Sequence, residues 1–179
     1  MNARIIDKII LSVKTSDGAG VRLRRSFGSH AALRLDPFLL FDEFGTENPE
    51  DYIAGFPPHP HRGFETVTYM IDGHMRHEDH LGNVGELKSG GHRRDSILAD
   101  ALEMPQQDRG RMRGFQLWIN LPARDKMQPA HYRDIPAGEI PSVELAGGRS
   151  VKVIAGRIAV EGRELTGPIN AVAGSMATD

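Results

Sequence analysis

The sequence contains no cysteine among its 179 residues. Disulfide bonds, thiolate metal ligands and a cysteine nucleophile are therefore excluded, and any bound metal ion must be held by nitrogen and oxygen atoms. The chain also lacks a surplus of either charge, since 22 Lys and Arg balance 24 Asp and Glu for a formal net charge of -2. This balance argues against nucleic-acid binding through bulk charge.

Long apolar runs are absent as well. No segment approaches the roughly 18 consecutive apolar residues that a membrane-spanning helix needs, and residues 1–8 contain no apolar core of a secretory signal. The sequence therefore predicts no membrane association and, by default, a cytoplasmic location.

Glycine and proline, in contrast, are plentiful, with 20 and 11 residues spread between short apolar segments. This punctuation is typical of strands joined by turns. The apolar segments predict strands at residues 9–13, 21–26, 38–41, 65–71, 115–121 and 151–158, with Trp118 in the core. The chain is thus expected to be all-β, a sandwich or a barrel, and Asp72-Gly73 predicts a hairpin turn.

Two regions differ from this pattern. Residues 95–104 are mostly good helix formers, with Asp95 or Ser96 as a cap and Pro105 as a stop, so they predict one or two helical turns. After residue 122, spaced prolines mark a polar connection. We therefore predict a main barrel over residues 1–125 and a second unit over residues 126–179.

His59 and His61 form the most informative motif, because residues i and i+2 of a strand point to the same face. Neutral imidazole is the commonest protein metal ligand, so the pair predicts half of a metal site. Glu65 shares their parity and is a candidate third ligand, an anchor for an imidazole N–H, or a rim residue on a strand end. His77-Glu78-Asp79-His80 is interpreted mainly as a solvated turn.

The sequence resembles the pirin family, which belongs to the cupin superfamily. The resemblance rests on five segments: DPFLLFDEF at 36–44, FPPHPHRGFETV at 56–67, GHMRHED at 73–79, MRGFQLWINLP at 112–122 and VKVIAG at 151–156. It implies two stacked β-barrels, the first binding one metal ion, usually iron, through three histidines and a glutamate.

Carried onto this chain, the resemblance implies His59, His61 and Glu103 as ligands of a divalent metal, Fe²⁺ in expectation. Residues 92–103 depart from the family pattern, and Ala101 occupies the position of the third histidine. An alanine methyl cannot donate to a metal. His92, Asp100 and Glu65 are the candidate substitutes. The family pattern also continues beyond residue 179, so the resemblance implies an incomplete second barrel.

Two functions remain open. In the first, the protein is a quercetin 2,3-dioxygenase: the metal organises a flavonol and dioxygen for oxidative ring opening, and Glu103 doubles as the base that takes the flavonol hydroxyl proton. In the second, it is a non-catalytic metal-binding or redox-sensing regulatory module with a protein partner, a degenerate copy whose metal site is impaired.

Overall fold

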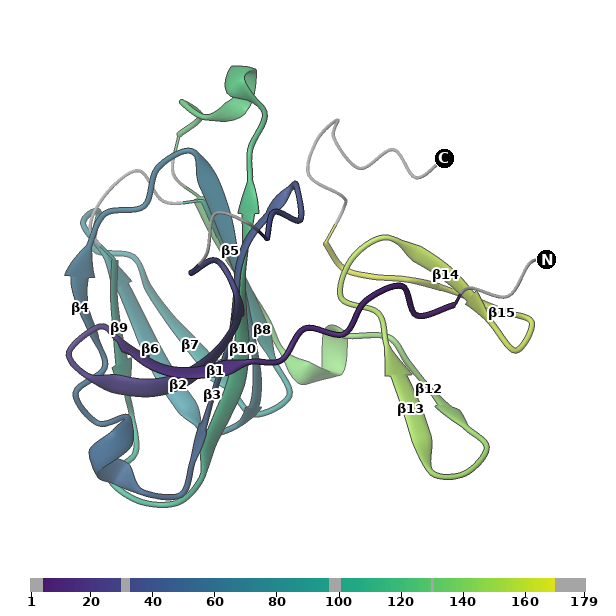
Figure 1. Cartoon of the computed structure of the whole chain (residues 1–179), viewed down its shortest axis with the longest axis horizontal. Coiled ribbons are helices and arrows are strands. Elements are labelled where there is room, and N and C mark those ends of the chain that lie inside the picture. The colour runs from purple at the N-terminus through teal and green to yellow at the C-terminus, as the bar shows by residue number, and fades with distance from the viewer. Residues whose placement is uncertain (1–4, 30–32, 97–100, 130, 170–179) are drawn as a thin grey trace.

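The computed structural model describes residues 5–29, 33–96, 101–129 and 131–169. Its strands form two antiparallel sheets that face each other, and two short hairpins follow beside them (Figure 1). The larger sheet has the order β1-β2-β3-β10-β5-β8-β11, and the smaller has the order β4-β9-β6-β7. The prediction of an all-β barrel is therefore confirmed.

The strands of the larger sheet are β1 (Val13–Asp17), β2 (Val21–Phe27), β3 (Phe38–Thr46), β5 (Phe64–Asp72), β8 (His92–Ser96), β10 (Met112–Asn120) and β11 (His131–Ile135). Those of the smaller sheet are β4 (Phe56–His59), β6 (His74–Asp79), β7 (Val84–Lys88) and β9 (Ala101–Pro105). The C-terminal hairpins are β12 (Ser142–Leu145) with β13 (Arg149–Lys152), and β14 (Arg157–Val160) with β15 (Arg163–Thr166). Short 3-10 turns lie at Pro49–Asp51, Ala123–Asp125 and Ala137–Glu139.

Two predicted strands are misplaced. Residues 9–12 precede β1, which begins at Val13, and the predicted strand at 151–158 is divided between β13 and β14. Gly156 lies between these strands with a φ of +74°, a conformation that interrupts an extended run. The apolar character of a segment therefore identified these regions as β-rich without placing the strand ends.

The hairpin predicted at Asp72-Gly73 is wrong. β5 pairs with β8 and β10 in the larger sheet, whereas β6 pairs with β7 and β9 in the smaller sheet. Gly73 has a φ of +117°, and it carries the chain from one sheet to the other. The dipeptide thus makes a turn between layers, which a local turn signal does not distinguish from a hairpin.

The helix predicted at 95–104 is also wrong at both of its described ends. Residues 95 and 96 belong to β8, and residues 101–105 form β9, while residues 97–100 lie outside the described residues. β8 pairs with β5 and β11, and β9 pairs with β4 and β6. Tertiary pairing therefore overrides the helical propensity of this segment.

The barrel core lies between the two sheets. It contains Leu23, Phe44, Tyr52, Met70, Met75, Leu87 and Met112, with Phe56 packed against it. Gly114 of β10 allows a close approach here, since a Cβ atom at this position would lie 2.5 Å from the Phe44 ring. The core is thus built from alternate residues of strands that are distant in sequence.

A second cluster covers the opposite face of the larger sheet. Ile135, Ile140 and Ile169 are buried there, with Tyr69 and Ile154 packed against them. β11 lies beyond residue 125 yet pairs with β8 of the larger sheet, and the domain boundary at 125 stays a prediction. Within the described residues, no helix has the length and apolar character to cross a membrane.

Candidate functional site

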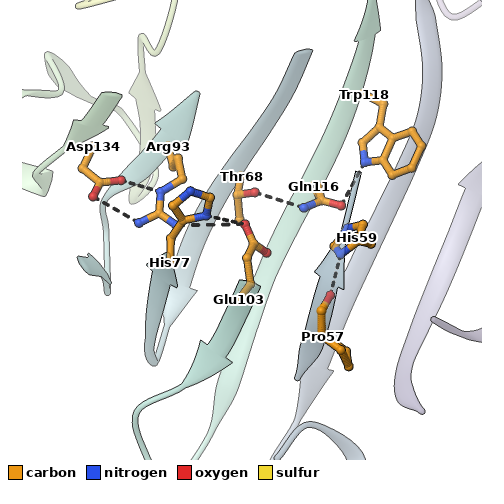
Figure 2. Close-up of polar contacts among 9 residues, drawn as sticks. All are labelled: Pro57, His59, Thr68, His77, Arg93, Glu103, Gln116, Trp118 and Asp134. Atoms are coloured by element: carbon orange, nitrogen blue, oxygen red, sulfur yellow. Dashed lines mark hydrogen bonds and ion pairs between the residues drawn. The ribbon is translucent and has the colours of Figure 1, made fainter. Parts of the chain in front are cut away.

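His59 and His61 meet at the end of β4. Their ring centroids are 4.6 Å apart, and the planes are inclined by 75°. The Nδ1 of His59 is 2.7 Å from the Pro57 carbonyl oxygen (Figure 2). Because a carbonyl only accepts, Nδ1 carries the proton and Nε2 presents a lone pair. His59 therefore has a tautomer in which Nε2 can bind a metal ion.

His61 is buried against aromatic rings. Its centroid lies 5.1 Å from Phe64 and 5.4 Å from Trp118, and neither ring nitrogen has a hydrogen-bond partner among the described residues. Burial, followed by the nearby imidazoles of His59 and His77, lowers the pKa of His61 to about 4. The ring is therefore neutral near pH 7, with a lone pair that no described group uses.

Glu103 reaches the same interior from β9. Strand pairing places it opposite His77 of β6, and it places Ala101 opposite His59 of β4. The Nδ1 of His77 is 3.9 Å from the Glu103 Oε1 atom. Burial raises the pKa of Glu103, and the charge of Arg93 opposes that shift. The carboxyl group thus lies among imidazoles, in a setting that makes it a stronger base than an exposed glutamate.

The interpretation of His77–His80 as a solvated turn is wrong for His77 and Asp79, which are buried residues of β6. His77 is fully buried, and burial followed by the charge of Arg93 lowers its pKa to about 4. Met75, His77 and Asp79 alternate with more exposed residues along β6, so they point inward together. That alternation is present in the sequence and would have identified His77 as an interior residue.

Sequence reasoning missed Arg93, which is almost completely buried. Its Nε and Nη2 atoms lie 2.6 and 3.1 Å from the two carboxylate oxygens of Asp134, and its Nη1 atom lies 4.0 Å from the Glu103 Oε1 atom (Figure 2). The helix predicted over 95–104 hid this residue. If 92–96 is taken as a strand, Arg93 faces away from both of its neighbours.

Glu65 and His92 lie on the other face of the larger sheet. β5 and β8 pair Thr68 with Arg93 and Val67 with Arg94. Because side chains alternate along a strand, Thr68 and Arg93 face inward, and Val67 and Arg94 face outward. Arg94 holds both Glu65 oxygens, at 2.6 and 3.0 Å. The shared parity of Glu65 with His59 carries no meaning, because β4 ends at His59 and β5 belongs to the other sheet. Asp100, the remaining candidate substitute, lies outside the described residues.

A cavity of about 330 Å³ opens beside His59 and Glu103. Its wall includes His59, Glu103, Gln116, Phe44, Phe56 and Trp118. The indole N–H of Trp118 donates to Gln116 at 2.9 Å, and the Gln116 amide donates to Thr68 at 3.3 Å (Figure 2). Trp118 was predicted as a core residue, but it is only half-buried and presents part of its ring to the cavity.

The donor groups are of the right chemical type for a metal ion, but their positions do not form a complete binding site. Imidazole and carboxylate groups suit iron and similar ions, and the two orphaned nitrogens of buried His61 need a partner. As the described side chains are placed, however, no three His, Asp or Glu groups lie close enough together to hold an ion. Binding would therefore require side chains in the cluster to turn toward one another.

Together, the two facing sheets and the histidine-lined interior define a protein of the cupin type. The family model described as Pirin matches residues 20–119, and the chain belongs to the pirin family. Both the predicted family and the predicted cupin fold are thereby confirmed.

The similar proteins are consistent with this family. A protein from Pseudomonas aeruginosa, named as a candidate quercetin 2,3-dioxygenase, is 60% identical over 144 residues, which cover 79% of this chain and 50% of that protein. A pirin-like protein from Caulobacter vibrioides is 50% identical, covering 87% and 57%. The crystal structure of a quercetin 2,3-dioxygenase from Acinetobacter baumannii is 30% identical with a TM-score of 0.78, covering 89% and 58%. The chain spans about half the length of the curated relatives it matches.

Proposed function

We propose that this barrel binds a divalent metal ion, Fe²⁺ by family resemblance, and oxidises a flavonol-like polyphenol with dioxygen. The supporting observation is the pair of orphaned His61 nitrogens, buried beside His59 next to an aromatic-lined cavity. The names of the relatives from Pseudomonas aeruginosa and Acinetobacter baumannii support the choice of substrate.

His59, His61 and Glu103 would hold the ion. His77 offers a third imidazole from β6, on the strand that pairs directly with β9. An ion held by such a mixed set, with open positions, would supply the redox-active and Lewis-acidic centre at which a flavonol reacts with dioxygen. The imidazole of His77 on the neighbouring strand would then replace the histidine that the family pattern has at position 101.

The chain's own side chains would orient the substrate and move a proton. Phe56 and Trp118 present ring surfaces to the cavity, and planar polyphenols stack on such surfaces. The hydrogen bonds from Trp118 to Gln116 and from Gln116 to Thr68 fix the indole orientation. Glu103 lines the same cavity, and as an ionised carboxylate it would accept the proton of a flavonol hydroxyl group.

A second candidate is a metal-binding regulatory module without catalysis, which acts through a protein partner. One observation favours it: Arg93 lies 4.0 Å from the Glu103 carboxylate, and no three described donors converge as they are placed. A weakly held ion suits reversible sensing better than turnover.

The two candidates are separated by measuring metal content and quercetin oxidation in one preparation. Protein purified under nitrogen is loaded with Fe²⁺ and desalted, and the iron is counted per chain. The loss of quercetin absorbance is then followed in air. Bound iron with turnover that disappears in His61→Ala supports the oxygenase. Bound iron without turnover leaves the regulatory module, and protein that binds no iron contradicts both.

A further inference from the structure

Arg93 stands between two carboxylates inside the barrel. One edge of its guanidinium group, Nε and Nη2, is engaged by both oxygens of Asp134. The remaining Nη1 atom points toward Glu103 at 4.0 Å (Figure 2). Asp134 comes from β11 and Glu103 from β9, so the guanidinium group links the two sheets across the interior.

This arrangement places a fixed positive charge next to a carboxylate that would bind a metal. A buried carboxylate needs a counter-charge, and a guanidinium group and a divalent ion are alternative ways to supply it. When both are present they repel each other strongly, because the interior screens charge poorly. Asp134 reduces this repulsion, since it neutralises the guanidinium group from the other side.

We propose that Arg93 is a built-in competitor for the metal ion at Glu103, and that Asp134 sets the strength of this competition. The inference rests on the metal site of the proposed function. Arg93 does not line the cavity and would act on the ion through Glu103, so it is a positioning residue that makes metal binding weak and exchangeable.

Co²⁺ binding to the full chain tests this proposal, since the ion gives a visible absorption spectrum when imidazole and carboxylate groups bind it. In Arg93→Met/Asp134→Asn, both charges are removed and Glu103 is left without a competing cation. We expect Co²⁺ to bind about 10- to 100-fold more tightly, the range typical of changes around the ligands. In Asp134→Asn alone, Glu103 becomes the main carboxylate partner of Arg93, and we expect binding about tenfold weaker.

The opposite signs keep the test independent of damage to the fold. A merely structural role for Arg93 would weaken binding in both variants, and thermal melts would show the loss. The matched control is Arg94→Met/Glu65→Gln, which removes the buried ion pair on the other face of β8 and should leave the Co²⁺ affinity within about twofold.

Each outcome is decisive for one of the two ideas. Equal or weaker binding in the double variant overturns the competition by Arg93, and the proposed metal site survives if His61→Ala abolishes the spectrum. Tighter binding in the double variant, without quercetin oxidation in any form of the protein, supports the competition and contradicts the oxygenase. If no folded variant binds Co²⁺, both proposals fail.

Discussion

The two faces of the larger sheet carry similar residues in different surroundings. The inner face meets His61, Glu103 and Arg93, and the outer face has His92, Glu65 and Arg94. The outer glutamate is fully engaged, because Arg94 holds both of its oxygens. The inner glutamate is 4.0 Å from its arginine and lines a cavity. A buried histidine, glutamate and arginine therefore make a candidate site only where the carboxylate is incompletely paired and solvent has access.

The largest expected effect comes from replacing a buried histidine on each face, His61 on the inner face and His92 on the outer face. Neither ring has a hydrogen-bond partner among the described residues, and both pKa values are lowered to about 4. We expect His61→Ala to abolish Co²⁺ binding and His92→Ala to leave the affinity within about twofold, because only His61 lies beside other donors. Titration followed by visible absorption measures both. Equal losses in the two variants would remove the distinction between the faces.

The next effect is the acid sensitivity of the outer face. Burial, followed by the charge of Arg133, lowers the pKa of His92 to about 4, so the unfolded chain binds this proton more readily than the folded one. Stability from this group is complete above pH 6.5 and is lost as the pH falls from 6.5 through about 4, by up to roughly 1.4 kcal/mol per pH unit.

This sensitivity is measured by urea denaturation of metal-free protein across that pH range. His92→Gln should reduce the slope between pH 6.5 and 4 by the contribution of one histidine, because an amide does not titrate, whereas His61 and His77 still do. His74→Gln is the matched control, since His74 is more exposed and pairs with Glu86 at the surface. An unchanged slope in His92→Gln would show that the ring is not held neutral by burial.

A comparison of the two glutamates sharpens the assignment of the carboxylate ligand. We expect Glu103→Gln to weaken Co²⁺ binding by about 10- to 100-fold, because the amide keeps the shape and loses the charge. Glu65→Gln should leave the affinity unchanged and lower the free energy of unfolding by about 1 to 3 kcal/mol, because a half-buried Arg94 loses its partner. Isothermal titration and urea denaturation give the two quantities, and a reversal of the pattern would assign Glu65 to the site.

The smallest effect concerns the cavity wall. Trp118→Phe keeps an aromatic ring and removes the N–H that donates to Gln116. We expect the KM for quercetin to rise by a few fold with kcat nearly unchanged, since a hydrogen bond of about 1 kcal/mol orients the ring. Phe27→Leu, in the stacked rings of Phe27 and Phe41, is the control. A fall in kcat alone would place Trp118 closer to the chemistry than the cavity suggests.

Part of the candidate site followed from local patterns, although β4 ends at His59 and His61 lies beyond it. The His-X-His motif predicted two neighbouring imidazoles, whose rings are in contact, and the family resemblance supplied Glu103 and the cupin fold. The inward position of His77 could have been predicted from the alternation of residues along β6. Arg93 was not, because helical propensity in the following segment concealed a strand whose pairing partners lie about 25 and 40 residues away.

The sequence by itself determined which metal-binding groups the protein has, namely imidazoles and carboxylates without thiols. It also determined that the chain forms enough strands for a barrel. Only the tertiary structure decided which of two consecutive arginines faces Glu103. The reason is physical, since side chains alternate along a strand and the register of β8 between β5 and β11 sends Arg93 inward and Arg94 outward. As a result, Arg94 forms a structural ion pair with Glu65, whereas Arg93 lies beside the candidate metal ligand Glu103.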